Sequence, residues 1–203
     1  MTVLGLDEAG RGAVLGPLVV GAYLVDDAHL DALAATGVTD SKKLSADKRE
    51  ALRGPLDTLG RWDVRAISAQ TIDGENLNVL EERAFVELIL QFRPDKVIID
   101  APCHPNGIPF FIDRLVKAIA YEPVLVVEPK ADLNHKPCGA ASIFAKTERD
   151  RAIHALGGVG SGYPGDPVTR AWIKGFFDRD EPLPACVRSR WGTIAALSQQ
   201  SLF

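Results

Sequence analysis

Short runs of apolar, often β-branched residues alternate along the chain with longer stretches in which apolar residues recur at helical spacing. The short runs predict strands, and the longer stretches predict amphipathic helices. Strands are expected over residues 3–6, 18–25, 62–68, 96–99 and 124–127. Helices are expected over residues 46–59, 76–92, 109–119, 138–156, 168–177 and 185–198. This alternation predicts an α/β fold, with helices on the faces of a mixed sheet.

Two local signals divide the chain. The helix over 76–92 begins at Asn76 and Asn78, which are good capping residues, and Pro94 closes it. Five glycines and one proline between residues 157 and 165 predict a loop. We therefore expect an α/β domain over residues 1–156, followed over residues 157–203 by a glycine loop and a small helical C-terminal region.

Composition excludes several classes of protein. The 203 residues are 46% hydrophobic and 25% charged, which is typical of a folded globular protein and not of a disordered chain, a collagen or a coiled coil. The longest uncharged run, residues 13–25, contains glycine and proline and is shorter than the roughly 18 apolar residues of a spanning helix. Three cysteines without CxxC spacing, and no secretory signal, favour a reducing cytoplasm.

Charge is unevenly distributed. The net charge is −4, but residues 1–129 hold 13 Lys and Arg against 20 Asp and Glu, whereas residues 130–203 hold 10 against 7. The two parts therefore carry −7 and +3. This asymmetry allows a basic face beside an acidic pocket. Ordinary scatter of solvated charges is the alternative interpretation.

Acidic residues follow three of the predicted strands. Asp7 and Glu8 come after the first strand, Asp100 comes directly after 96–99, and Asp132 follows the strand over 124–127. Ligand sites in open α/β sheets gather at such strand ends. Oxygen-only ligands suit Mg²⁺ or Mn²⁺. The alternative is that Asp7 is a turn residue, Asp100 and Asp132 cap helices, and Glu8 is solvated.

A glycine-rich turn follows the first acids. Its spacing, Gly10-x-Gly12-x-x-x-Gly16, does not match the GxGxxG pattern of dinucleotide sites, and the chain has no GxxxxGK motif. Gly10 and Gly12 allow a ligand to approach the backbone closely, with Arg11 as an adjacent cation. The alternative is a tight turn between two strands.

Seven sequence blocks, in order, resemble those of the ribonuclease HII family, the type 2 ribonucleases H. The blocks are GLDEAGRGAVLGPLVVGA (5–22), DSKKLSADKRE (40–50), VIIDA (97–101), KAD (130–132), AASIFAKTERD (140–150), GSGYPGDP (160–167) and RSRW (188–191). The resemblance implies a ribonuclease H-like fold whose C-terminal region completes the substrate groove. It implies that Asp7, Glu8, Asp100 and Asp132 are the catalytic residues and the ligands of Mg²⁺ or Mn²⁺.

The resemblance also implies the reaction. The family hydrolyses the RNA strand of RNA–DNA hybrids and cuts on the 5′ side of ribonucleotides in duplex DNA, leaving 3′-hydroxyl and 5′-phosphate ends by a two-metal-ion mechanism. A catalytically inactive hybrid-binding or clamp-associated module is the alternative. Ribonuclease HIII fits less well, because that family carries a preceding domain and here the first block begins at residue 5. The substrate-binding residues implied are Gly10, Arg11, Gly12, Lys42, Lys43, Ser142, Lys146 and Tyr163.

Smaller features give further expectations. Arg149 and Asp150 are interpreted as a structural pair. Cys103, His104 and His135 lie near the acids but lack the spacing of a tetrahedral zinc site, and His135 either positions water or is a surface histidine. Residues Gln199 to Phe203 resemble peptides that dock on replication sliding clamps, with a frayed terminus as the alternative. A monomer is expected.

Overall fold

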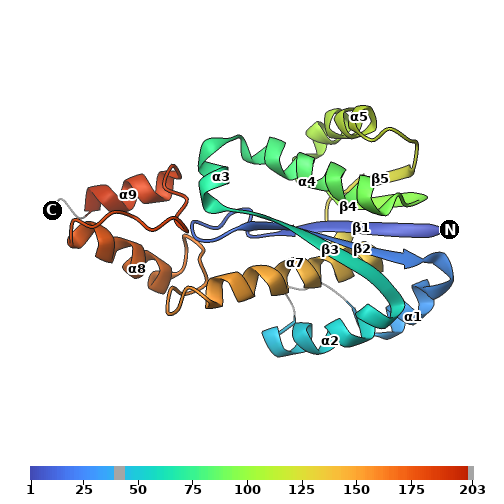
Figure 1. The fold of residues 1–203 in the computed structure, drawn as a ribbon, viewed down its shortest axis with the longest axis horizontal. Helices are drawn as coiled ribbons and strands as arrows, with labels where there is room; N and C mark the ends of the chain where they lie inside the picture. The colour runs from blue at the N-terminus through green and yellow to red at the C-terminus, as the bar shows by residue number, and fades with distance from the viewer. Residues whose placement is uncertain (39–43, 201–203) are drawn as a thin grey trace. The chain divides into compact units, whose positions relative to one another are not determined.

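A computed structural model describes residues 1–38 and 44–200 of the chain. Its sheet has the strand order β3-β2-β1-β4-β5 (Figure 1). Strands β1 and β4, and β4 and β5, pair in parallel. The mixed sheet flanked by helices confirms the predicted fold class. The strands are β1 (Thr2–Ala9), β2 (Leu18–Asp26), β3 (Gly60–Ile67), β4 (Lys96–Asp100) and β5 (Val124–Glu128).

Most predicted helices form close to the expected bounds. The longer helices are α2 (Ala46–Leu59), α4 (Leu77–Phe92), α5 (Ile108–Ala118), α7 (Lys136–His154), α8 (Pro167–Asp178) and α9 (Gly192–Gln200). The short helices α1 (Leu30–Ala35), α3 (Ala69–Gly74) and α6 (Ala131–Asn134) were not predicted, because four to six residues are too few for a periodic signal. The described helices include none that is both long enough and apolar enough to cross a membrane.

The prediction of a helix over 185–198 was wrong at its beginning. Helix α9 begins only at Gly192. The preceding backbone pairs with a distant segment instead: Leu15 and Val187 form an antiparallel bridge, and the Arg188 N–H donates to the Val14 carbonyl at 2.9 Å. These long-range hydrogen bonds replace the local ones that a helix would need.

The described chain forms two compact units that interleave in sequence. Unit 1 comprises residues 1–9, 20–65 and 81–147, and unit 2 comprises residues 10–19, 66–80 and 148–203. The expected division into an α/β domain over residues 1–156 and a C-terminal region over residues 157–203 stays a prediction.

In unit 1, helices cover both faces of the sheet. Helices α1, α2 and α7 lie on one face, and α5 with the unit 1 part of α4 lies on the other (Figure 1). On the α7 face, Phe144 stacks on Trp62 with 4.2 Å between ring centroids. Glycines allow α7 to approach closely, since a Cβ on Gly5 would lie 2.1 Å from the Pro137 carbonyl carbon and one on Gly21 would lie 2.5 Å from the Ala141 oxygen. Helix α7 is therefore held directly against β1 and β2.

Unit 2 has its own apolar core, to which α8 and α9 contribute. Ile173 and Ile194 are buried there together with Val14 and Leu15. The N–H groups of Val14 and Leu15 both donate to the Gly162 carbonyl, at 2.8 and 3.1 Å. Unit 2 thus joins the turn after β1 to the glycine loop and to the segment before α9.

Candidate active site

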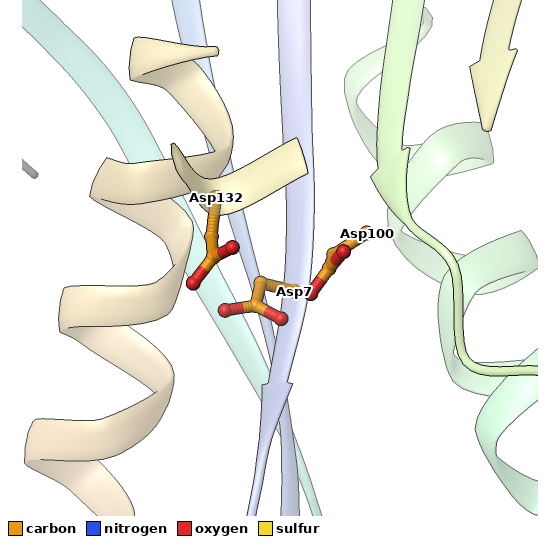
Figure 2. Close-up of side chains that lie close together, drawn as sticks. All are labelled: Asp7, Asp100 and Asp132. Atoms are coloured by element: carbon orange, nitrogen blue, oxygen red, sulfur yellow. The ribbon is translucent and has the colours of Figure 1, made fainter. Parts of the chain in front are cut away.

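Three aspartates from different parts of unit 1 come together. Leu6 of β1 and Ile99 of β4 are partners in the parallel register, so Asp7 and Asp100 are the next residues on neighbouring strands. Asp132 comes from α6. Oxygen atoms of the three carboxylates lie within 4.8 Å of one another, and Figure 2 shows the side chains directed toward a common point.

The beginning of α6 places Asp132. Lys130 adopts a left-handed backbone conformation with φ of +63°, which turns the chain into the helix after β5. The N–H of Ala131 then donates to Oδ1 of Asp100 at 3.0 Å. Asp100 therefore anchors the first residue of α6 and faces Asp132. The expectation that the strand ends bring these acids together is confirmed for these three residues, and Asp7 lies within β1 and not in a turn.

Burial and like charge make this cluster unfavourable without a cation. Asp7 and Asp132 are only 5% and 6% exposed. The pKa of Asp7 is raised well above its ordinary value, chiefly by burial and then by the charges of Glu8 and Asp100. A set of ligand atoms made up of oxygens suits Mg²⁺ and Mn²⁺. The three aspartates therefore fit a divalent metal site.

Glu8 occupies a different position from the three aspartates. Glu8 directly follows Asp7 in β1, and the strand continues to Ala9. The group of possible metal ligands found among the described residues does not include Glu8. Its charge nevertheless raises the pKa of Asp7. A role for Glu8 as a metal ligand stays a prediction.

Helix α7 contributes two of the predicted substrate-binding residues. Ser142 is buried and hydrogen-bonds to the carboxylate of Asp7, which lowers the pKa of that group. Lys146 follows one helical turn later and is half-buried. The structure thus shows a contact of Ser142 with a candidate metal ligand, which sequence reasoning did not foresee. Lys42 and Lys43 lie outside the described residues.

The glycine-rich turn belongs to unit 2. Gly10 has a φ of +85°, and a Cβ there would lie 2.7 Å from the Pro17 oxygen, so glycine is required. Gly12 is exposed, and a Cβ there would meet nothing within 4 Å. The side chain of Arg11 donates a hydrogen bond to Asn78. The turn therefore presents open backbone at Gly12.

Tyr163 stacks on a buried arginine. The Arg149 guanidinium lies over its ring at 4.5 Å from the centroid. The same group donates to the Ser161 carbonyl at 2.6 Å and pairs with Asp150 at 3.3 Å. The expected pair of Arg149 and Asp150 is present, but Arg149 also supports the tyrosine, a contact that the sequence did not reveal.

Sequence reasoning also missed Arg188. Its side chain is fully buried, and all three guanidinium nitrogens donate to carbonyl oxygens of the turn, namely those of Gly10, Arg11 and Gly16. The RSRW block contained this residue, but an arginine in sequence gives no sign of burial.

Cys103, His104 and His135 do not form a zinc site in the described structure. The metal-ligand group found within residues 1–38 and 44–200 contains only the three aspartates. His135 instead lies 3.2 Å from Glu128, as a half-exposed pair of side chains at the end of α6. This pairing agrees with the interpretation of His135 as a surface residue.

Comparison with known proteins identifies relatives along the whole chain. A family model described as Ribonuclease HII matches residues 4–194. A ribonuclease HII of Methanocella arvoryzae is 39% identical, covering 97% of this chain and 91% of the relative. Ribonuclease H2 from Pyrococcus horikoshii superposes with a TM-score of 0.90 at 34% identity, covering 100% of this chain and 99% of that one. A structure of the PCNA:RNase HII complex from Archaeoglobus fulgidus gives 0.86 at 36% identity, covering 96% of each chain.

Fold and site together define a metal-dependent nuclease with a ribonuclease H-like architecture. Among such nucleases, the matches over nearly the whole sequence identify the family of this chain. The chain belongs to the ribonuclease HII family, and it is a metal-dependent endoribonuclease.

Proposed function

We propose that this endoribonuclease hydrolyses the RNA strand of RNA–DNA hybrids and incises duplex DNA on the 5′ side of embedded ribonucleotides. The products would carry 3′-hydroxyl and 5′-phosphate ends. The observation that carries this proposal is the convergence of Asp7, Asp100 and Asp132 within 4.8 Å in a member of the ribonuclease HII family.

The metal would be Mg²⁺ or Mn²⁺, held by these three aspartates with Glu8 as the fourth proposed ligand. Two divalent ions at such a site supply an activated water and stabilisation of the leaving oxygen. Asp100 orients the site through its hydrogen bond to the Ala131 N–H, and Ser142 orients Asp7. These two hydrogen bonds keep the carboxylates directed toward one point.

A water nucleophile agrees with the side chains present. Attack by the neighbouring 2′-hydroxyl would give a cyclic phosphate, whereas attack by water gives the 5′-phosphate proposed here. Cys138 is buried, and its thiol donates to the Ile98 carbonyl at 3.1 Å. Burial raises the pKa of this thiol, as do the charges of the aspartates, so it stays protonated. Cys138 is therefore no candidate for covalent catalysis.

Ribose recognition is assigned to Gly10, Arg11, Gly12 and Tyr163. The exposed backbone at Gly12 allows close approach of a sugar, and the 2′-hydroxyl is the group that separates RNA from DNA. The ring of Tyr163 is held by Arg149, which supports a packing role against a sugar. Lys146, together with Lys42 and Lys43, would contact phosphates and supply affinity without sequence preference.

The test uses a duplex with one ribonucleotide and a matched all-DNA duplex, each with Mg²⁺, with Mn²⁺ and with chelator. We expect a cut on the 5′ side of the ribonucleotide, only in the presence of metal, with product ends mapped by mass. Asp100→Asn should bind the duplex without cutting it. A cut on the 3′ side, or one that persists in chelator, would contradict the mechanism. Binding without any cutting by the unaltered chain would favour the inactive module instead.

A sliding clamp is the second proposed partner. The structure from Archaeoglobus fulgidus, 36% identical to this chain, is a PCNA:RNase HII complex. Helix α9 ends at Gln200, so the proposed docking segment, residues 199–203, overlaps its last turn, and its final three residues lie outside the described structure. Leu202 and Phe203 supply apolar side chains for a groove.

Gel filtration of the full chain and of a chain lacking residues 199–203, each with clamp, tests this proposal. Equal co-elution of the two chains with the clamp would contradict it. The chain alone should elute as a monomer.

We also propose that the protein works in the cytoplasm. Its cysteines, Cys103, Cys138 and Cys186, form no disulfide within the described structure, which suits a reducing compartment. Cell fractionation with an antibody to the chain would test the assignment, and recovery outside the cytoplasmic fraction would overturn it.

A further inference from the structure

Arg188 lies in unit 2 at a place where a charged side chain is costly. Its side chain has no solvent exposure, and its pKa is lowered to about 10 by burial and by the neighbouring charge of Arg149. It therefore remains protonated at neutral pH, which requires that its donors be satisfied. The carbonyl groups of one short segment of chain accept hydrogen bonds from all three guanidinium nitrogens.

That segment is the turn from Gly10 to Gly16. Nη2 donates to the Gly10 carbonyl at 2.8 Å, Nη1 to the Arg11 carbonyl at 3.0 Å and Nε to the Gly16 carbonyl at 3.2 Å. The planar guanidinium fork matches three acceptors at once, which an ammonium on a flexible stem does not do. The backbone of the Arg188 segment adds to this, because the Gly16 N–H donates to the Cys186 carbonyl at 2.8 Å.

These hydrogen bonds fix the direction of two consecutive peptide groups. The described chain contains no cis peptide bond. In a trans peptide the C=O and the following N–H point in opposite directions. Since the carbonyls of Gly10 and Arg11 point toward the guanidinium, the N–H groups of Arg11 and Gly12 point away from it. Gly12 itself is exposed, and a Cβ added to it would meet nothing within 4 Å, so a ligand can approach this residue closely.

We propose that Arg188 is a positioning residue that determines ribose specificity, by orienting the Arg11 and Gly12 N–H groups toward an oxygen of the bound sugar. This inference rests on the proposed function of the turn. It assigns to a buried side chain, distant in sequence, the task of holding the turn in its binding conformation before substrate arrives.

The experiment measures binding, by fluorescence anisotropy, of a duplex with one ribonucleotide and of the matched all-DNA duplex. All proteins carry Asp100→Asn so that the substrate stays intact. Arg188→Met removes the fork, Arg188→Lys keeps the charge without it, and Arg190→Met is the control, since Arg190 is an exposed neighbour on the same segment. Mn²⁺ affinity is measured for the same Arg188 and Arg190 variants in proteins that keep Asp100.

We expect the preference for the ribonucleotide duplex to fall at least about tenfold in Arg188→Met and by a smaller factor in Arg188→Lys. Arg190→Met should keep it. Binding of all-DNA duplex and of Mn²⁺ should be unchanged, whereas general unfolding would reduce every one of these affinities. If Arg188→Met does not fold, Arg188→Lys decides.

Retention of the full preference by a folded Arg188→Met or by Arg188→Lys would overturn the inference. An equal loss of affinity for both duplexes would also overturn it. Absence of any preference in the parent protein would instead contradict the proposed function, so the two failures are distinguishable.

Discussion

Gly5 of β1 lies directly beneath Pro137 of α7, so close that a Cβ on Gly5 would sit 2.1 Å from the Pro137 carbonyl carbon and 2.3 Å from the Cys138 nitrogen. Both neighbours are backbone atoms, which cannot rotate away. The same helix carries Ser142, which hydrogen-bonds to Asp7 two residues after Gly5. The close approach of helix and strand therefore determines the geometry of the acidic cluster.

Gly5→Ala should destabilise the protein by about 3 kcal/mol or more, because the added methyl group displaces α7 from the sheet. It should also weaken Mn²⁺ binding, since the displacement moves Ser142 away from Asp7. Denaturant unfolding and calorimetric titration measure the two effects. The control is Gly74→Ala, where the added Cβ meets nothing within 4 Å. Equal stability of the two variants would show that α7 accommodates the methyl group.

The metal-free protein should become more stable as the pH falls toward mild acidity. Burial and the charge of Glu8 raise the pKa of Asp7 above its ordinary value of 3.8, so the folded state binds this proton more tightly than the unfolded state. Between 3.8 and the raised pKa, protonation therefore contributes stability that is lost as the pH rises through the folded pKa.

Denaturation in chelator between about pH 8 and about pH 5 measures this contribution. Asp7→Asn does not titrate and should flatten the dependence. Saturating Mg²⁺ should oppose the dependence, because the cation favours the ionised carboxylates. A profile for Asp7→Asn with the same slope as that of the parent would assign the effect to another group.

Ser142→Ala should lower the affinity for Mn²⁺ by roughly tenfold, because Asp7 loses the hydrogen bond that favours its ionised form. Titration calorimetry gives the affinity directly. Ser45→Ala is the matched control: Ser45 caps α2 by accepting from the Lys48 N–H at 3.3 Å, and its loss should cost about 1 kcal/mol of stability without affecting Mn²⁺. Unchanged affinity in Ser142→Ala would remove the serine from the metal site.

Arg149→Met should cost about 2 kcal/mol or more of unfolding free energy, because the Ser161 carbonyl loses a charged donor and Tyr163 loses its stacking partner. Arg151 on the same helix offers a control, since its pair with Glu148 is half-exposed and at the surface. Arg151→Met should change stability by less than about 1 kcal/mol. Denaturant unfolding of both variants decides; equal costs would mean that the burial of Arg149 contributes little.

Much of the fold could be predicted because it follows from local pattern. The expected helix over 46–59 forms with those bounds as α2, since Ser45 is a good cap and the apolar spacing continues to Leu59. The β-branched runs form β4 and β5 within a residue of expectation. Acids placed directly after such runs pointed to Asp7 and Asp100, because parallel strands end at one edge of a sheet.

Other parts of the site could not be predicted from local pattern. The group of possible metal ligands among the described residues leaves out Glu8, and the length of β1, which continues to Ala9, was not visible in a glycine-rich segment. The contact of Ser142 with Asp7 depends on how closely α7 packs. The burial of Arg149 and Arg188 depends on carbonyl groups contributed by residues far away in sequence.

The sequence by itself determined the order of the strands and of the longer helices, the family likeness and the acidic residues that follow the strands. Periodicity and strand ends are properties of neighbouring residues, so these features could be predicted locally. Only the tertiary structure decided which carboxylates meet, which serine supports them and which arginine holds the glycine turn. Those relationships depend on register, helix approach and the satisfaction of buried charges by distant backbone, and none of these is a local property of the chain.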